Sequence, residues 1–142
     1  MAACLSFEEI ISAGNPQISK LRDVGNSYPT SDAPGACAAF SEEVRQVEAL
    51  VRHTYALAAH LARKTGSLEE VATFWKEMSK LCDVALGVLR GLRDRYPYCG
   101  TPELYDLTLD YKHAADERFN RVKEELAWAT TEIPKGLFPV LN

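Results

Sequence analysis

The amino-acid sequence predicts an all-α fold: an antiparallel, up-and-down bundle of three long helices with a shorter helical segment at the N-terminus. Three observations support this prediction. Apolar residues recur at alternating spacings of four and three along three long stretches, which is the spacing of one buried helix face. Proline and glycine separate these stretches. The connections are also short, and short connections make neighbouring helices antiparallel.

Residues 1–33 are expected to contain a short helical segment and a loop. Ser6 and Glu9 have the spacing of a capping box, in which two side chains satisfy free amide groups at a helix start. The Gly-Asn-Pro run at 14–16 predicts an interruption, after which the helix restarts because asparagine and proline suit the cap and the first helical position. The stretch 25–35 is rich in Gly, Pro and Ser and predicts a loop.

The three long helices are expected within residues 34–131. The first covers 34–64, and the second follows a cap at Ser67, which forms a capping box with the glutamate three residues later. The third starts with Thr101 as its cap and a proline at its first position. The expected buried stripes are Phe40, Val44, Val47, Val51, Thr54, Ala58 and Leu61; Val71, Trp75, Met78, Cys82, Ala85, Leu89 and Leu92; and Leu104, Thr108, Tyr111, Ala115, Val122, Leu126 and Ala129.

Antiparallel packing also predicts ion pairs at the helix ends. Exposed pairs contribute only about 0.2–1 kcal/mol each, but a single topology accounts for all of them. The expected groups are Arg63 and Lys64 with Glu69, Glu70, Glu124 and Glu125, and Arg90, Arg93 and Arg95 with Glu103 and Asp106.

Length and composition limit the remaining possibilities. The 142 residues suit one domain spanning 1–142, with an extended tail at 132–142, because one core serves roughly 100–200 residues. The net charge of −4 disfavours nucleic acid and membrane surfaces as partners, since both require a surplus of Lys and Arg. Without a basic signal segment or a long apolar run, we expect an intracellular, cytoplasmic protein. Its four cysteines form no Cys-x-x-Cys pair and are expected to be free thiols, with Cys99 the most exposed.

The titratable residues do not predict a catalytic, cofactor or metal site. Asp106, Asp110, His113 and Glu117 share one face of the third long helix. Di-iron bundles need such residues to face inward from several helices, so we interpret this row as a solvated face in which Glu117 pairs with Arg121.

Two segments are candidate partner-binding surfaces. The end of the second long helix concentrates Arg93, Arg95, Tyr96 and Tyr98, residue types that are frequent at binding hot spots. The apolar tail residues Leu137 and Phe138 could fit a groove on a partner. The alternatives are that the tyrosines close the end of the core and that the tail folds back over the bundle.

The expected function is therefore a non-catalytic protein–protein interaction or scaffold module. Its partner would be another protein or a second copy, since the helix stripes resemble coiled-coil seams. The alternative is a small-ligand-binding or enzymatic bundle with a site around Cys99, Tyr111 and His113.

Overall fold

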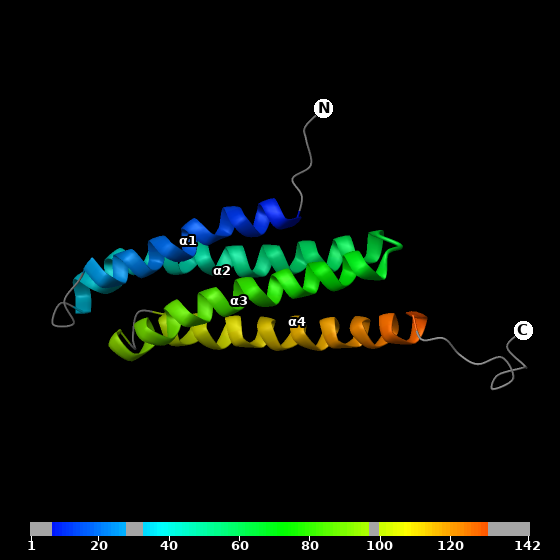
Figure 1. Cartoon of the computed structure of the whole chain (residues 1–142). Helices are drawn as coiled ribbons and strands as arrows, with labels where there is room; N and C mark the ends of the chain where they lie inside the picture. The colour runs from blue at the N-terminus through cyan, green and yellow to red at the C-terminus, as the bar shows by residue number, and fades with distance from the viewer. Residues whose placement is uncertain (1–6, 28–32, 97–99, 131–142) are drawn as a thin grey trace, which may run out of the picture.

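The computed structural model describes residues 7–27, 33–96 and 100–130, and it confirms the all-α class. These residues form four α-helices and no strand: α1 (Phe7–Ser27), α2 (Ala33–Lys64), α3 (Leu68–Arg95) and α4 (Thr101–Thr130). Figure 1 shows them as long rods lying side by side. The three predicted long helices are confirmed to within about two residues at each end.

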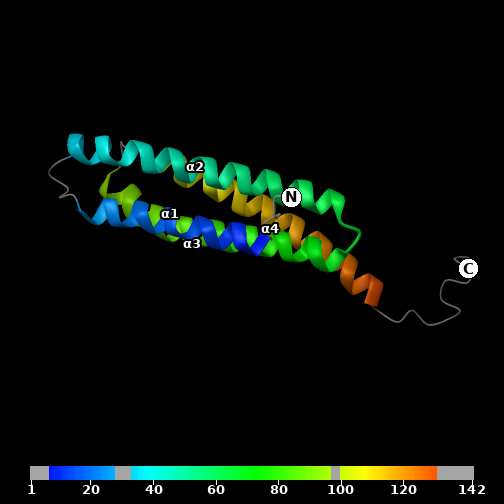
Figure 2. The same ribbon diagram turned by 90° about the horizontal axis from the view of Figure 1, so that it is seen from above.

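Consecutive helices run in opposite directions, and α1 and α4 occupy opposite corners of the bundle (Figures 1 and 2). The most extensive pairing is between α3 and α4, and α3 also contacts α1 and α2. In the described part of the chain, α1 and α4 do not contact each other. The rings of Phe7 and Phe74 meet near the starts of α1 and α3, and Asn26 meets Arg95 near their ends. Helices α1 and α3 are therefore parallel neighbours.

The predicted apolar stripes form the core of the bundle. Each long helix buries the face on which its four-three pattern lies, and α1 adds a fourth apolar surface. The side chains of Phe40 and Ala129 lie outside the described part. The buried stripe residues are Val47, Val51, Thr54 and Ala58 on α2; Trp75, Met78, Cys82, Ala85, Leu89 and Leu92 on α3; and Leu104, Thr108, Ala115 and Val122 on α4; α1 contributes Phe7, Ile11, Ile18 and Leu21.

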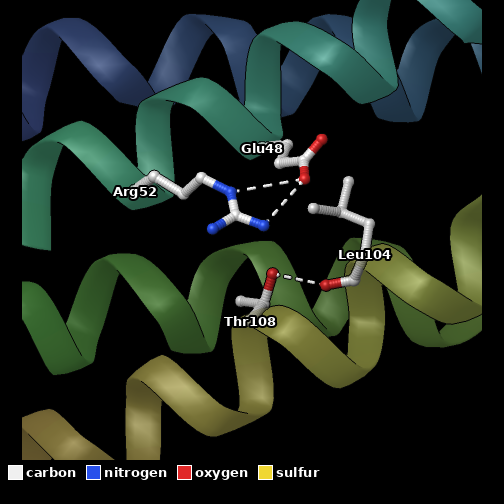
Figure 3. Close-up of polar contacts among 4 residues, drawn as sticks. All are labelled: Glu48, Arg52, Leu104 and Thr108. Atoms are coloured by element: carbon white, nitrogen blue, oxygen red, sulfur yellow. Dashed lines mark hydrogen bonds and ion pairs between the residues drawn. The ribbon is translucent and has the colours of Figure 1, made fainter.

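A buried hydroxyl on α4 shows how the core accommodates a polar stripe residue. Thr108 is fully buried, and its hydroxyl donates a 2.7 Å hydrogen bond to the carbonyl oxygen of Leu104. The polar group is thereby satisfied without water. Figure 3 shows this contact facing α2, where Arg52 donates hydrogen bonds of 3.3 and 3.1 Å to the Glu48 carboxylate one turn away.

The predicted interruption at residues 14–16 is wrong, because α1 is one continuous helix with Pro16 inside it. Gly14 is buried where α1 approaches α2, and an added Cβ would lie 2.8 Å from Cδ1 of Leu50. The glycine therefore permits close helix packing and does not end the helix. Burial of Ile18 and Leu21 beyond the proline outweighs the lost backbone hydrogen bond.

The predicted caps are correct in part. The hydroxyl of Ser67 accepts a 3.3 Å hydrogen bond from the Glu70 amide, as a cap should. The Glu70 carboxylate accepts from the Thr65 hydroxyl, however, and the Ser67 amide donates to that same hydroxyl, so the capping box is not closed. The buried Thr101 hydroxyl donates 2.6 Å to the carbonyl oxygen of Tyr96, which makes Thr101 a link between α3 and α4 and not a cap.

The predicted ion pairs at the helix ends are also wrong. Among the described residues, none of those cations lies within ion-pair distance of the acidic residues assigned to it, because exposed charges gain little over water. Arg93 instead lies 4.2 Å above the ring of Tyr105. Ion pairs between helices include Lys20 with Glu43 (3.4 Å) and Lys112 with Asp83 (2.9 Å).

Candidate functional site

The polar cluster that joins α3 to α4 has the composition of a serine–lysine site but not its electrostatics. Ser79 donates to Asp116, and Nζ of Lys112 lies 3.2 Å from Oγ of Ser79. The same Nζ lies 2.9 Å from Asp83 and 3.1 Å from Asp116. A lysine activates a serine only if the lysine is neutral and can take the proton of the hydroxyl.

Lys112 is not neutral in this setting. Burial alone would lower the pKa of Lys112, but hydrogen bonds and attraction from Asp83 and Asp116 outweigh burial and raise the pKa above its usual value. The ammonium group therefore stays charged at neutral pH and cannot accept the proton of Ser79. The cluster therefore has a structural role: its hydrogen bonds and ion pairs join α3 to α4.

The described cysteines do not supply a nucleophile. Burial raises the pKa of Cys82 to about 12, so almost no thiolate forms near neutral pH. Cys37 is disulfide-bonded, and the prediction that it is a free thiol is wrong. Sequence spacing alone does not show which cysteines meet in space, and this is why the bond was missed. Cys4 and Cys99 lie outside the described residues.

The acidic row on α4 is exposed to solvent. Asp106, Asp110, His113 and Glu117 all point outward, and Arg121 lies 3.4 Å from Glu117, which confirms the predicted i,i+4 pair. Within the described ranges, no group of three or more His, Cys, Asp or Glu side chains could hold a metal ion.

The alternative site around Cys99, Tyr111 and His113 is not assembled by the described residues. The Tyr111 ring packs 4.8 Å from the ring of Tyr55, toward α2. His113 is exposed on a different face of α4. Cys99 lies outside the described part, so the structure does not place all three residues.

The predicted recognition residues near the end of α3 have three different environments. Tyr96 is fully buried, and its hydroxyl donates a 3.3 Å hydrogen bond to the carbonyl oxygen of Gly25. It therefore closes the end of the core and presents no surface to a partner. Arg93 stacks on Tyr105, while Arg95 is exposed and donates to the Asn26 side chain at 3.2 Å. Tyr98, Leu137 and Phe138 lie outside the described residues.

A groove between α1 and α3 contains Arg95 and a set of residues that the sequence analysis missed. Its volume is about 500 Å³, and its floor is a face of α3 that combines valines with two exposed glycines. Val84 is 49% exposed, which is unusual for a large apolar side chain in this chain. Charged or polar groups border the floor. The lining residues are Arg22, Asn26, Asp83, Val84, Gly87, Val88, Gly91, Leu92 and Arg95.

Gly87 and Gly91 distinguish this groove from an ordinary helix surface. They lie one turn apart inside α3, and a Cβ added to either would meet nothing within 4 Å. Glycine inside a helix costs roughly 0.5–1 kcal/mol relative to alanine. Packing within the described part of the chain does not account for this cost, in contrast to Gly14. The pattern Gly-x-x-x-Gly in the sequence was the available signal, but it does not by itself show which face is exposed.

Two other surface hollows have less distinct features. One, between α1 and α2, measures about 370 Å³ and mixes Leu50 and Leu57 with polar side chains including Gln46 and His53. The other lies on α4 alone and is lined by charged or polar groups such as His113 and Glu117, along the solvated row. Of these three hollows on the described residues, the α1–α3 groove combines an apolar floor with charged ends.

No helix in the described ranges has both the length and the apolar composition needed to cross a membrane. Among the described residues, Trp128 near the end of α4 is 64% exposed, and it joins Val84 as a large apolar side chain with high exposure. Comparison with known protein families, curated proteins and solved structures found no match.

Proposed function

We propose that this protein is a non-catalytic interaction module that binds a helix of a partner protein in the groove between α1 and α3. The observation that carries the proposal is the pair of exposed glycines, Gly87 and Gly91, in the middle of a long helix with open space above them. Glycines spaced by four residues allow two helix backbones to approach closely. A partner helix packed against α3 would fill the open space above these two glycines, which no described residue of this chain fills.

The size of the groove fits this type of ligand. From Asp83 to Arg95 the floor follows thirteen residues of α3, which are twelve steps of 1.5 Å or about 18 Å. This corresponds to about three helical turns, a common length for a helix that docks into a groove. Val84 and Val88 offer apolar contact area, and the charged residues at both ends would fix the direction of the bound helix.

The partner class follows from charge. A net charge of −4 favours protein over nucleic acid as the partner. Tyr98, Leu137 and Phe138 remain proposed additional contacts. The intracellular, cytoplasmic location expected from the sequence stays a prediction, and the disulfide bond of Cys37 counts against it because cytosolic reductants keep most thiols reduced.

Replacing both glycines by alanine separates folding from binding. Because each methyl group enters open space, Gly87→Ala with Gly91→Ala should raise the free energy of unfolding by about 1–2 kcal/mol in total. The same methyl groups stand on the proposed contact surface and should weaken partner binding. Urea denaturation at low protein concentration measures the first effect. Quantitative co-purification from native cells, followed by titration of the purified partner, measures the second.

Gly66→Ala provides a matched control. Gly66 lies in the α2–α3 connection, and an added Cβ there also meets nothing within 4 Å. This variant should retain every partner that the wild-type chain retains. If the double variant binds the same partners with unchanged affinity, the proposed binding surface is wrong.

A further inference from the structure

We propose that the helix bound in the α1–α3 groove is α3 of a second copy of this chain, packed antiparallel across Gly87 and Gly91. This inference rests on the proposed function and names the partner. The supporting observation is that the groove has an acidic residue, Asp83, at one end and a basic residue, Arg95, at the other. In an antiparallel pair of copies, each acidic end meets a basic end.

The sequence positions have the symmetry that such a pairing needs. Gly87 and Gly91 are each two residues from Leu89, and Asp83 and Arg95 are each six residues from it. In an antiparallel pair with its two-fold axis at the height of Leu89, position 87 faces position 91 of the second copy, and position 83 faces position 95. Apart from Leu89, the four residues of these two pairs line the groove, so they share the face that would be covered.

The charges at the two ends favour this register. Asp83 is 57% exposed, and its partner Lys112 is shared with Asp116, so this end retains a net negative charge. Arg95 donates to the neutral side chain of Asn26, and no carboxylate of the described residues lies within ion-pair distance of it. Antiparallel packing places Arg95 of each copy beside Asp83 of the other. A parallel arrangement would place like charges together, which disfavours it.

A closed two-fold pair also explains why the glycines occur on one face only. In an isologous interface the same surface patch of both copies is in contact, so Gly87 of one copy lies opposite Gly91 of the other. Two glycine positions facing each other allow the backbones of the two α3 helices to approach, and the flanking Val84 and Val88 then lose contact with water. The half-exposed valine and the open space above the glycines have a common explanation in this arrangement.

Complementary charge reversal tests the register directly. Alone, the Asp83→Arg variant would place two arginines together at each end of the pair, and the Arg95→Asp variant would place two aspartates together. Each variant should therefore self-associate about tenfold or more weakly than the wild type. An equimolar mixture restores opposite charges at both ends and should associate as the wild type does. Sedimentation over about a hundredfold range of concentration measures all four samples.

Circular dichroism and the melting temperature show whether each variant is folded. The Arg95→Asp variant keeps the ion pairs of Lys112 with Asp83 and Asp116. In a separate test, Gly87→Leu should abolish association. A wild-type chain that stays monomeric at every concentration overturns this inference but leaves binding of a different protein helix intact as the proposed function. A wild-type dimer that is insensitive to Gly87→Leu, or single variants whose mixture does not associate, would place the interface elsewhere and also overturn it.

Discussion

Substitution of Trp75 by alanine is expected to lower the free energy of unfolding by about 3–5 kcal/mol, as for other large aromatic residues removed from cores. Trp75 is 2% exposed in the core of the bundle, where its ring lies 5.2 Å from the ring of Tyr55. The guanidinium of Arg118 lies over the Trp75 ring at 5.2 Å and donates to the Tyr55 hydroxyl at 3.0 Å. The substitution thus removes contacts to both α2 and α4. Urea denaturation followed by circular dichroism measures the loss.

Trp128 provides the matched control because it is 64% exposed near the end of α4. Trp128→Ala should change the free energy of unfolding by less than about 0.5 kcal/mol, as is usual for surface positions. Equal losses for the two tryptophans would contradict the observed packing of the core.

Substitution of Tyr96 by alanine is expected to cost a similar amount, about 3–5 kcal/mol, because its ring is fully buried at the end of the bundle. The position also joins three elements. Its hydroxyl donates to the Gly25 carbonyl, its own carbonyl accepts from the Thr101 hydroxyl, and its amide donates to the Leu92 carbonyl. Loss of the side chain leaves a cavity where α1, α3 and the start of α4 meet.

Tyr96→Phe separates the ring from its hydrogen bond. It keeps the packing of the ring and removes the 3.3 Å hydrogen bond to Gly25, so the cost should be about 0.5–1.5 kcal/mol. Thermal and urea denaturation of both variants measure the difference. A recognition tyrosine on the surface would behave differently: Tyr96→Ala would leave stability unchanged and reduce binding.

The helices were predictable because their signals are local. The four-three spacing of apolar residues on α2, α3 and α4 needs no knowledge of the partner helix, and Trp75, Val51 and Leu104 are buried as this spacing predicts. The end of α2 at Lys64 and the cap at Ser67 were also correct, since glycine and serine act there on their own backbone neighbours.

The errors concern features that depend on residues distant in sequence. Gly14 resembles a helix breaker until Leu50 is seen packed against it from α2. Thr101 has the residue type and the position of a cap, but its hydroxyl donates to Tyr96 across the turn. Charged residues at the ends of different helices could not be paired correctly, since the gain from each exposed pair is too small to select one partner over water.

The candidate site was only partly predictable for the same reason. Arg95 was identified from its residue type, and it does border the groove. The spacing of apolar residues identifies the buried face of α3. It gives no information on Gly87 and Gly91, because these glycines lie on the exposed face. For Tyr96 the sequence left two alternatives, a partner contact or closure of the core end, because tyrosine is common both at interfaces and in cores; its burial selects the second.

A photo-crosslinking amino acid placed at position 84 tests the central claim most directly, because Val84 is exposed on the floor of the α1–α3 groove. The same amino acid at position 56 is the control, since Ala56 is exposed on α2 away from the groove. After illumination in native cells, we expect a covalent adduct from position 84 and none from position 56, with the mass of the adduct identifying a second copy or another protein. No adduct from position 84, or equal adducts from both positions, would contradict an interaction module that acts through this groove.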